Sequence, residues 1–231
     1  MAWLARRTWS PALLIMALLI WFGVLLGCAV AAGELLAQAE RPDGSTAIDS
    51  SITSWMVDHR TAGLTAIARV FSAIGSQKVL APVAGVAAVL LIGRRRILTA
   101  ALLAAIWGGA IGLYNLTKHF VHRTRPPDDL HLTRVGASSF PSGHATQSMA
   151  TFVALAVLAW AVIPRLRAFP AVVAVAVGLS LGVGWSRVYL GVHWTSDVIA
   201  GWLIGAAWVS LALWLARRTP TRPAPPPTAA R

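Results

Sequence analysis

Six long apolar runs, separated by short polar or basic segments, dominate the chain. An α-helix needs about 20 residues to cross roughly 30 Å of hydrocarbon, and most of these runs are close to that length. Between the first two runs, apolar residues in 51–72 recur at helical spacing, which predicts one amphipathic helix at the membrane interface or packed over the bundle. The pattern predicts an all-α, polytopic bundle of six transmembrane helices, at about residues 12–33, 79–93, 97–115, 142–163, 169–185 and 192–216.

The overall composition agrees with a membrane protein. Of the 231 residues, 57% are hydrophobic and 12% are charged, with a mean hydropathy of +0.67, which is too apolar for an ordinary soluble domain. The net charge of +12 could indicate nucleic-acid binding, but the arginines form short clusters between apolar runs and not one solvated face. We therefore expect the bilayer, and no nucleic acid, as a partner. Cys28 is the only cysteine, so no intrachain disulfide is possible.

The two ends of the chain need separate interpretation. The first apolar run follows Arg6 and Arg7, which is the layout of a signal peptide or of a first transmembrane helix. Its length favours a helix that is retained, and processing near Cys28 stays open. Residues 219–231 are rich in Pro and Ala and have no core-forming residues, so we predict a single transmembrane domain over 1–218 and a disordered cytoplasmic tail.

The basic clusters suggest an orientation, because cytoplasmic loops collect Lys and Arg near helix ends. With the N-terminus inside and six helices, every Asp, Glu and His falls on the outer side or at the outer helix ends. Four cations also fall outside, so the sorting of positive charge is a bias and not a clean split. We expect a multi-pass protein of a bacterial inner membrane with its site facing away from the cytoplasm. The inner-side cations are Arg6, Arg7, Arg94, Arg95, Arg96, Arg165, Arg167, Arg217 and Arg218; the outer exceptions are Arg41, Arg60, Arg69 and Lys78.

Two groups of chemically interesting residues flank the loop between the third and fourth predicted membrane helices. Lys118 and Arg125 place two cations at a helix end, where snorkelling to lipid headgroups is the alternative explanation. Ser142 and Gly143 then open the next helix, whose free N–H groups and dipole make an anion site. Ser142 could instead serve only as an N-cap, but that does not account for His144.

A third group surrounds the start of the last predicted membrane helix. His193 and Asp197 are four residues apart, so their side chains share one helix face. The aspartate can hold the Nδ1 proton of His193 and leave Nε2 as a nucleophile, although a purely structural hydrogen bond is the alternative. Arg187 adds a planar guanidinium that suits bidentate binding of a phosphoryl group.

Taken together, these residues suit phosphoryl transfer without a metal ion. Fixed donors must neutralise the equatorial phosphoryl oxygens, and a nucleophile and an acid must approach from opposite sides. His193 can attack while His144 protonates the leaving oxygen. The residues that would bind the phosphoryl group are Lys118, Arg125, Ser142, Gly143 and Arg187.

Three groups of residues resemble, at every defining position, the three-part signature of the type 2 phosphatidic acid phosphatase superfamily. The groups are Lys118, Arg125 and Pro126; Pro141 to His144; and Ser186, Arg187, His193 and Asp197. The signature spans 118–197, and the pattern of apolar runs extends the likeness over most of the chain. The resemblance implies a phosphohistidine on His193, oriented by Asp197, with acid catalysis by His144. It also implies a lipid phosphate substrate and no metal or other cofactor.

Several alternatives stay open at this level. The substrate could be a polyprenyl diphosphate, phosphatidic acid or a related lipid, and the oligomeric state is unreadable. Vanadate-dependent haloperoxidases resemble the same superfamily but are typically soluble, and a lipid-phosphate binding or transport protein would need the cations but no nucleophile. His119, His122 and His131 crowd one loop, where we expect solvated side chains and no metal site.

Overall fold

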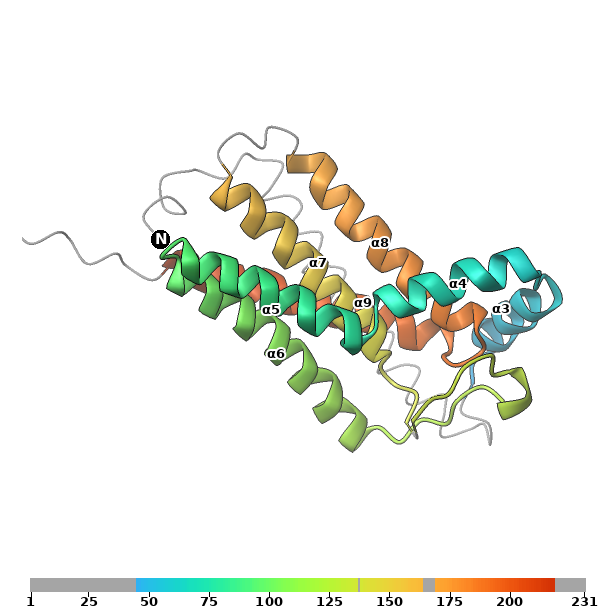
Figure 1. The fold of residues 1–231 in the computed structure, drawn as a ribbon. Coiled ribbons are helices and arrows are strands. Elements are labelled where there is room, and N and C mark those ends of the chain that lie inside the picture. Colours follow the sequence, from blue (N-terminus) through green and yellow to red (C-terminus); the bar gives the residue numbers. More distant parts are fainter. Residues whose placement is uncertain (1–44, 137, 164–168, 219–231) are drawn as a thin grey trace, which may run out of the picture.

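The computed structural model describes residues 45–136, 138–163 and 169–218, and all secondary structure in these ranges is helical. The first predicted membrane helix and the predicted disordered tail lie outside the described residues. The described helices are α3 (Ala47–Asp58), α4 (Ala62–Ile74), α5 (Gln77–Gly93), α6 (Ile97–Phe120), α7 (Gly143–Val162), α8 (Phe169–Tyr189) and α9 (Thr195–Arg218), with a short 3-10 helix at Asp128–Leu130 (Figure 1).

Long apolar helices make the chain a multi-pass membrane protein. Within the described ranges, three helices are long and apolar enough to span a bilayer: Ile97–Phe120, Pro170–Tyr189 and Thr195–Ala216. Helices α4 and α5 meet this criterion only as a pair bent by 45°, a broken span or a re-entrant segment, and the number is four if the pair counts as one span. The expected total of six spans stays a prediction.

Helix α7 lies at the centre of the bundle, where it packs against α6, α8 and α9 (Figure 1). Its first half carries buried polar side chains, including Thr146, Gln147 and Thr151. Because neighbouring helices and not lipid surround these residues, their polarity is tolerated at this position. Helix α7 matches the predicted run at 142–163. It is not among the helices apolar enough to span a bilayer by composition, because its central position allows polar side chains.

The segment predicted as one amphipathic helix over 51–72 forms two helices, α3 and α4, so the prediction of a single continuous helix is wrong. Helix α3 ends at Asp58 and α4 begins after Thr61, whose hydroxyl accepts a hydrogen bond from the backbone N–H of Leu64 at 3.2 Å. This is the capping interaction that starts a new helix. Between the helices, Arg60 donates to the backbone carbonyls of Leu130 and Tyr189, at 2.8 and 3.0 Å, which ties the break to the loops near α9.

Tight packing of α9 on α7 brings the start of one helix against the start of the other. A Cβ atom at Gly201 would lie 2.7 Å from the carbonyl oxygen of Ser142, so only glycine permits this approach. At the other end of the bundle lie the α5–α6 turn, with Arg94 to Arg96, and the end of α9 (Figure 1). The basic turn and the residues near Ser142 are therefore at opposite ends of the helices.

Candidate active site

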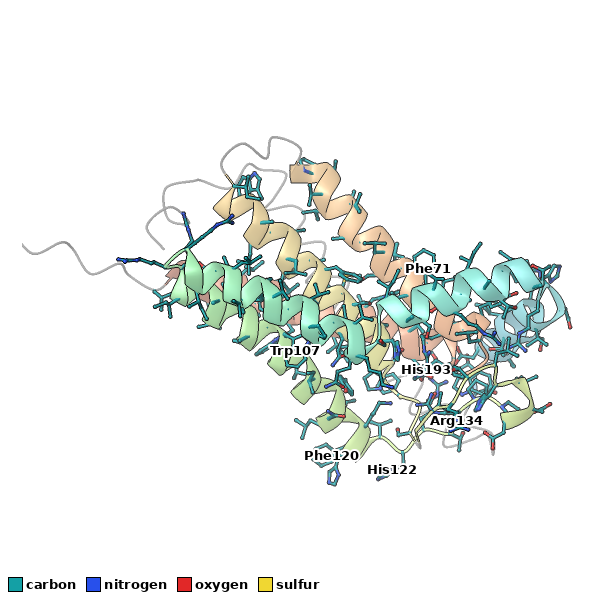
Figure 2. All side chains as sticks on the ribbon, in the orientation of Figure 1. Phe71, Trp107, Phe120, His122, Arg134 and His193 are labelled. Atoms are coloured by element: carbon teal, nitrogen blue, oxygen red, sulfur yellow. The ribbon has the colours of Figure 1, made fainter. Side chains whose placement is uncertain are left out.

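Three segments that are far apart in the sequence meet around one cavity of about 390 Å³. They are the end of α6 with the loop that follows it, the start of α7, and the α8–α9 region, and Gln77 at the start of α5 adds to the lining. Figure 2 shows His193 and Arg134 at this end of the bundle. Of the eight predicted site residues, six line the cavity and two, Ser142 and Asp197, are fully buried. The lining residues are Gln77, Tyr114, Asn115, Lys118, Arg125, Arg134, Val135, Gly136, Ser138, Gly143, His144, Gln147, Arg187 and His193.

The ring of His193 is held between a carboxylate and a guanidinium. Its Nδ1 lies 3.3 Å from Oδ2 of Asp197 and 3.4 Å from Oγ of Ser139, while its Nε2 lies 3.3 Å from Nη1 of Arg125. Since the guanidinium can only donate, Nε2 acts as the acceptor and Nδ1 carries the proton. This tautomer leaves a lone pair on Nε2, the nitrogen that the sequence pattern assigned to nucleophilic attack.

Asp197 itself is fixed by several donors. The hydroxyl of Ser139 donates to Oδ2 at 2.5 Å and the backbone N–H of Trp194 donates to the same oxygen at 2.9 Å. Arg123 donates to Oδ1 at 2.8 Å. A carboxylate with this many partners has little freedom to rotate, so it defines the position of the His193 ring.

The protonation state of His193 follows from its burial in the loop between α8 and α9. Burial lowers the pKa of this histidine to about 3, because the low-dielectric surroundings disfavour the charged ring. Asp197 opposes the shift, whereas Arg125 and Arg187 add to it. His193 is therefore uncharged at neutral pH, as a nitrogen nucleophile must be.

Two of the cations hold the loop that covers the site. Lys118 donates from Nζ to the carbonyls of Ser138, at 2.6 Å, and Ser139, at 3.3 Å. Arg125 donates to the carbonyls of Ser138, at 2.9 Å, Gly136, at 2.7 Å, and Val192. Both side chains thus add positive charge to the cavity and anchor its walls, which goes beyond the simple phosphate-binding role expected from the sequence.

Other donors near the cavity have no hydrogen-bond partner among the described residues. They are Nε of Arg187, Oγ of Ser142 and Nε2 of Gln147, each buried. Ser142 occupies the N-cap position of α7, as the alternative explanation has it, but its side chain makes no cap hydrogen bond. Unpaired buried donors are costly, and an anionic ligand would satisfy them. Arg187 is positioned by Ser72, to whose hydroxyl Nη1 donates.

Sequence patterns missed several of these contributors. Ser139 and Arg123 lie within the signature region, three residues before Ser142 and two before Arg125, but the family pattern gives them no role. Gln147, three residues after His144, lies on the same helix face, a spacing from which its place beside the cavity could have been inferred. No sequence signal pointed to Asp49, which contacts Arg123 from α3.

His119, His122, His131 and Trp194 lie outside the lining of the cavity. His119 and His122 are exposed, and His131 contacts the carbonyl of Pro126 at 2.9 Å. Across the described ranges, no group of three or more His, Cys, Asp or Glu side chains is placed to hold a metal ion. Trp194 donates to the carbonyl of Thr124 at 3.0 Å and does not line the cavity. Tyr114 and Asn115, about one turn before Lys118 on α6, do line it.

Comparison with known proteins decides the family. The model of the PAP2 superfamily matches residues 97–220, which is more than half of the chain. The chain belongs to the PAP2 superfamily. The matched residues include every position of the predicted signature, from the end of α6 to the start of α9.

Relatives of this PAP2 family member are lipid phosphatases. Phosphatidylglycerophosphatase B of Bacillus subtilis is 27% identical over 172 residues, which cover 74% of this chain and 84% of that protein. Lipid A 1-phosphatase of Rhizobium johnstonii is 40% identical over 109 residues, 43% of this chain and 40% of that protein. The crystal structure of the PAP2 type phosphatidylglycerolphosphate phosphatase from Bacillus subtilis superposes with a TM-score of 0.76 at 22% identity. The superposition covers 90% of this chain and 98% of that chain, so the two proteins share the fold.

Proposed function

We propose that this PAP2 protein hydrolyses a lipid phosphate monoester or diphosphate through a phosphohistidine on His193. The observation that carries the proposal is the geometry of that histidine. It is buried, its Nε2 lies beside Arg125, and its Nδ1 faces Asp197. A protein that only binds or transports a lipid phosphate would need the cations but no nucleophile oriented in this way.

The proposed reaction has two displacement steps. In the first, Nε2 of His193 forms a bond to phosphorus while the bond between phosphorus and the lipid oxygen breaks, and His144 gives a proton to that oxygen. In the second, a water molecule gives a proton to His144 and attacks phosphorus. The bond between phosphorus and nitrogen breaks, which releases phosphate and regenerates the neutral imidazole.

Positive charge around the cavity would stabilise both transition states. Lys118, Arg125 and Arg187 neutralise the charge on the phosphoryl oxygens, while Ser142 and the N–H of Gly143 donate to them. The N-terminus of α7 adds its partial positive charge at the same place. These donors, already held by the fold, need little reorganisation when charge develops.

An amphiphilic substrate suits the position of the cavity at one end of a membrane bundle. Candidates are polyprenyl diphosphates, phosphatidic acid and phosphatidylglycerol phosphate, whose headgroup would enter the cavity while the tail stays among the helices. The basic turn at Arg94 to Arg96 lies at the opposite end of the bundle, which supports a cavity that faces away from the cytoplasm of a bacterial inner membrane. Labelling of Arg134→Cys, in a Cys28→Ser background, by a membrane-impermeant maleimide in intact cells tests this orientation.

The activity is tested by phosphate release from these lipids in detergent micelles with EDTA present. We expect turnover by the wild-type protein and none above background by His193→Ala. His122→Ala is a matched control, because this histidine is exposed on the loop after α6 and should leave turnover unchanged. Full activity of folded His193→Ala would refute the mechanism, and absence of phosphate release from every lipid would refute the function.

A further inference from the structure

Arg123 joins two carboxylates that come from opposite ends of the described chain. Its Nη2 lies 2.7 Å from Oδ2 of Asp49 on α3, and its Nη1 lies 2.8 Å from Oδ1 of Asp197 on α9. All three side chains are at most 1% exposed. An arginine fork that spans two buried carboxylates fixes both of them, since each pair is directional as well as charged.

Asp49 also contacts the first turn of α9 directly. Its Oδ1 accepts a hydrogen bond from the backbone N–H of Ser196 at 3.0 Å, and its Oδ2 accepts one from the hydroxyl of the same serine at 2.6 Å. The first N–H groups of a helix lack partners within the helix, and a negative charge is favoured there. Asp49 therefore caps α9 from a different helix, at the turn that carries Asp197.

Asp49, Arg123 and Asp197 together carry one negative charge in excess on the Nδ1 side of His193, whereas the cations Arg125 and Arg187 lie on the cavity side of the ring. Asp49 and Asp197 contribute two negative charges and Arg123 one positive charge, while His193 is neutral. When Nε2 bonds to phosphorus, the imidazole ring becomes cationic. The excess negative charge then offsets the new positive charge at short range, in surroundings where electrostatic interactions are stronger than in water.

From these contacts we infer that Asp49 and Arg123 are positioning residues for the reaction, which act through Asp197 on His193. The inference rests on the proposed phosphohistidine mechanism. Arg123 sets the rotation of the Asp197 carboxylate, and Asp49 sets both the orientation of Arg123 and the start of α9. Helix α3 is thus part of the catalytic apparatus, although none of its residues lines the cavity.

Two conservative variants test this role with the full-length protein. Asp49→Asn keeps the shape of the side chain but removes its charge, and Arg123→Lys keeps the charge but cannot bridge two carboxylates. We expect the single-turnover rate constant for phosphate release, measured with saturating enzyme in excess over a lipid phosphate, to fall by roughly 10- to 100-fold in each, the range typical when a group that orients a functional side chain is lost. The KM and the inhibition constant of inorganic phosphate should stay at their wild-type values, because Lys118 and Arg187 are untouched.

The single-turnover readout separates positioning from folding, since its rate constant does not depend on the fraction of protein that is active. Asp58→Asn is the matched control, because this aspartate is exposed on the same helix and should leave the rate constant unchanged. Asp49→Glu should recover part of the lost rate, and combining Asp49→Asn with Arg123→Lys should cost less than the product of the two single effects.

An unchanged rate constant in Asp49→Asn would overturn the inference even if Arg123→Lys fails to fold. So would a loss that appears only as weaker inhibition by inorganic phosphate, because that would place the effect on phosphate binding. Wild-type protein that releases no phosphate from any lipid would instead refute the proposed function, so the two failures are distinguishable.

Discussion

Replacing Arg187 by lysine tests whether this residue provides the main fork for the phosphoryl group. Nη1 of Arg187 donates to Ser72, while Nε has no partner among the described residues. A lysine keeps the positive charge but has a single ammonium group, which cannot both replace the contact with Ser72 and bind the phosphoryl group as a fork does. The variant should therefore lose one charge-assisted hydrogen bond, worth about 1.5–3 kcal/mol.

At about 1.36 kcal/mol for each factor of ten, this loss corresponds to a decrease in kcat/KM of roughly 10- to 150-fold. The assay is initial-rate phosphate release from a lipid phosphate in mixed micelles. Ser72→Ala is a graded control, since it removes only the hydrogen bond that positions Arg187 and should lower kcat/KM by roughly 2- to 10-fold. Folded Arg187→Lys protein with wild-type kcat/KM would refute the assignment of this arginine.

Three further predictions concern the histidines and the turn before His193. With its pKa near 3, His193 should stay neutral from pH 8 to pH 5 in ¹⁵N spectra of the free protein, and a titration midpoint near 6.5 would contradict this. In this pH range the unfolded chain binds a proton at this histidine that the native state does not bind. The free energy of unfolding should therefore fall as the pH drops from 6.5 toward 3. His144→Ala should slow hydrolysis of a lipid phosphate by roughly 100- to 10,000-fold. The same variant should slow hydrolysis of p-nitrophenyl phosphate much less, because the p-nitrophenolate leaving group needs no acid. Equal losses with the two substrates would refute the assignment of His144 as the acid. Gly191 has a φ of +73°, and a Cβ atom there would lie only 2.3 Å from the carbonyl oxygen of Leu130. Gly191→Ala should therefore lower the free energy of unfolding by at least about 1–2 kcal/mol in thermal denaturation. Gly178→Ala is the control and should leave it unchanged, because open space surrounds that position. Equal stability of the two alanine variants would show that the turn tolerates a side chain.

The arrangement of the site separates the residues that bind charge from those that orient the nucleophile. Lys118 and Arg125 support the loop over the cavity through backbone carbonyls, so substitutions there should disturb the shape of the site as well as its charge. Arg187, by contrast, lines the same cavity, and its Nε has no hydrogen-bond partner in the described part of the chain. Equal substitutions at the three cations are therefore expected to have unequal effects, although the sequence pattern treats them alike.

The sequence by itself determined the membrane class and the main chemistry. Apolar runs predicted the positions of α5 to α9, because a helix that crosses a bilayer needs about 20 predominantly apolar residues. The three signature segments predicted residues that the fold does bring around one cavity. Local spacing indicated that His193 and Asp197 are neighbours, but the expectation that they share one helix face is wrong: α9 begins at Thr195, and His193 contacts Asp197 from the loop before the helix.

Only the tertiary structure decided which groups support those residues. Asp49 and Asp197 each lie 74 residues from Arg123, and no periodicity links positions that far apart. The break between α3 and α4 depends on Arg60, whose partners lie 70 and 129 residues away. The central place of α7 depends on its neighbours in the same way, because buried polar residues are stable there only when helices and not lipid surround them. Contacts of this kind arise from packing, so the sequence could indicate the catalytic residues but not the helix that holds them in place.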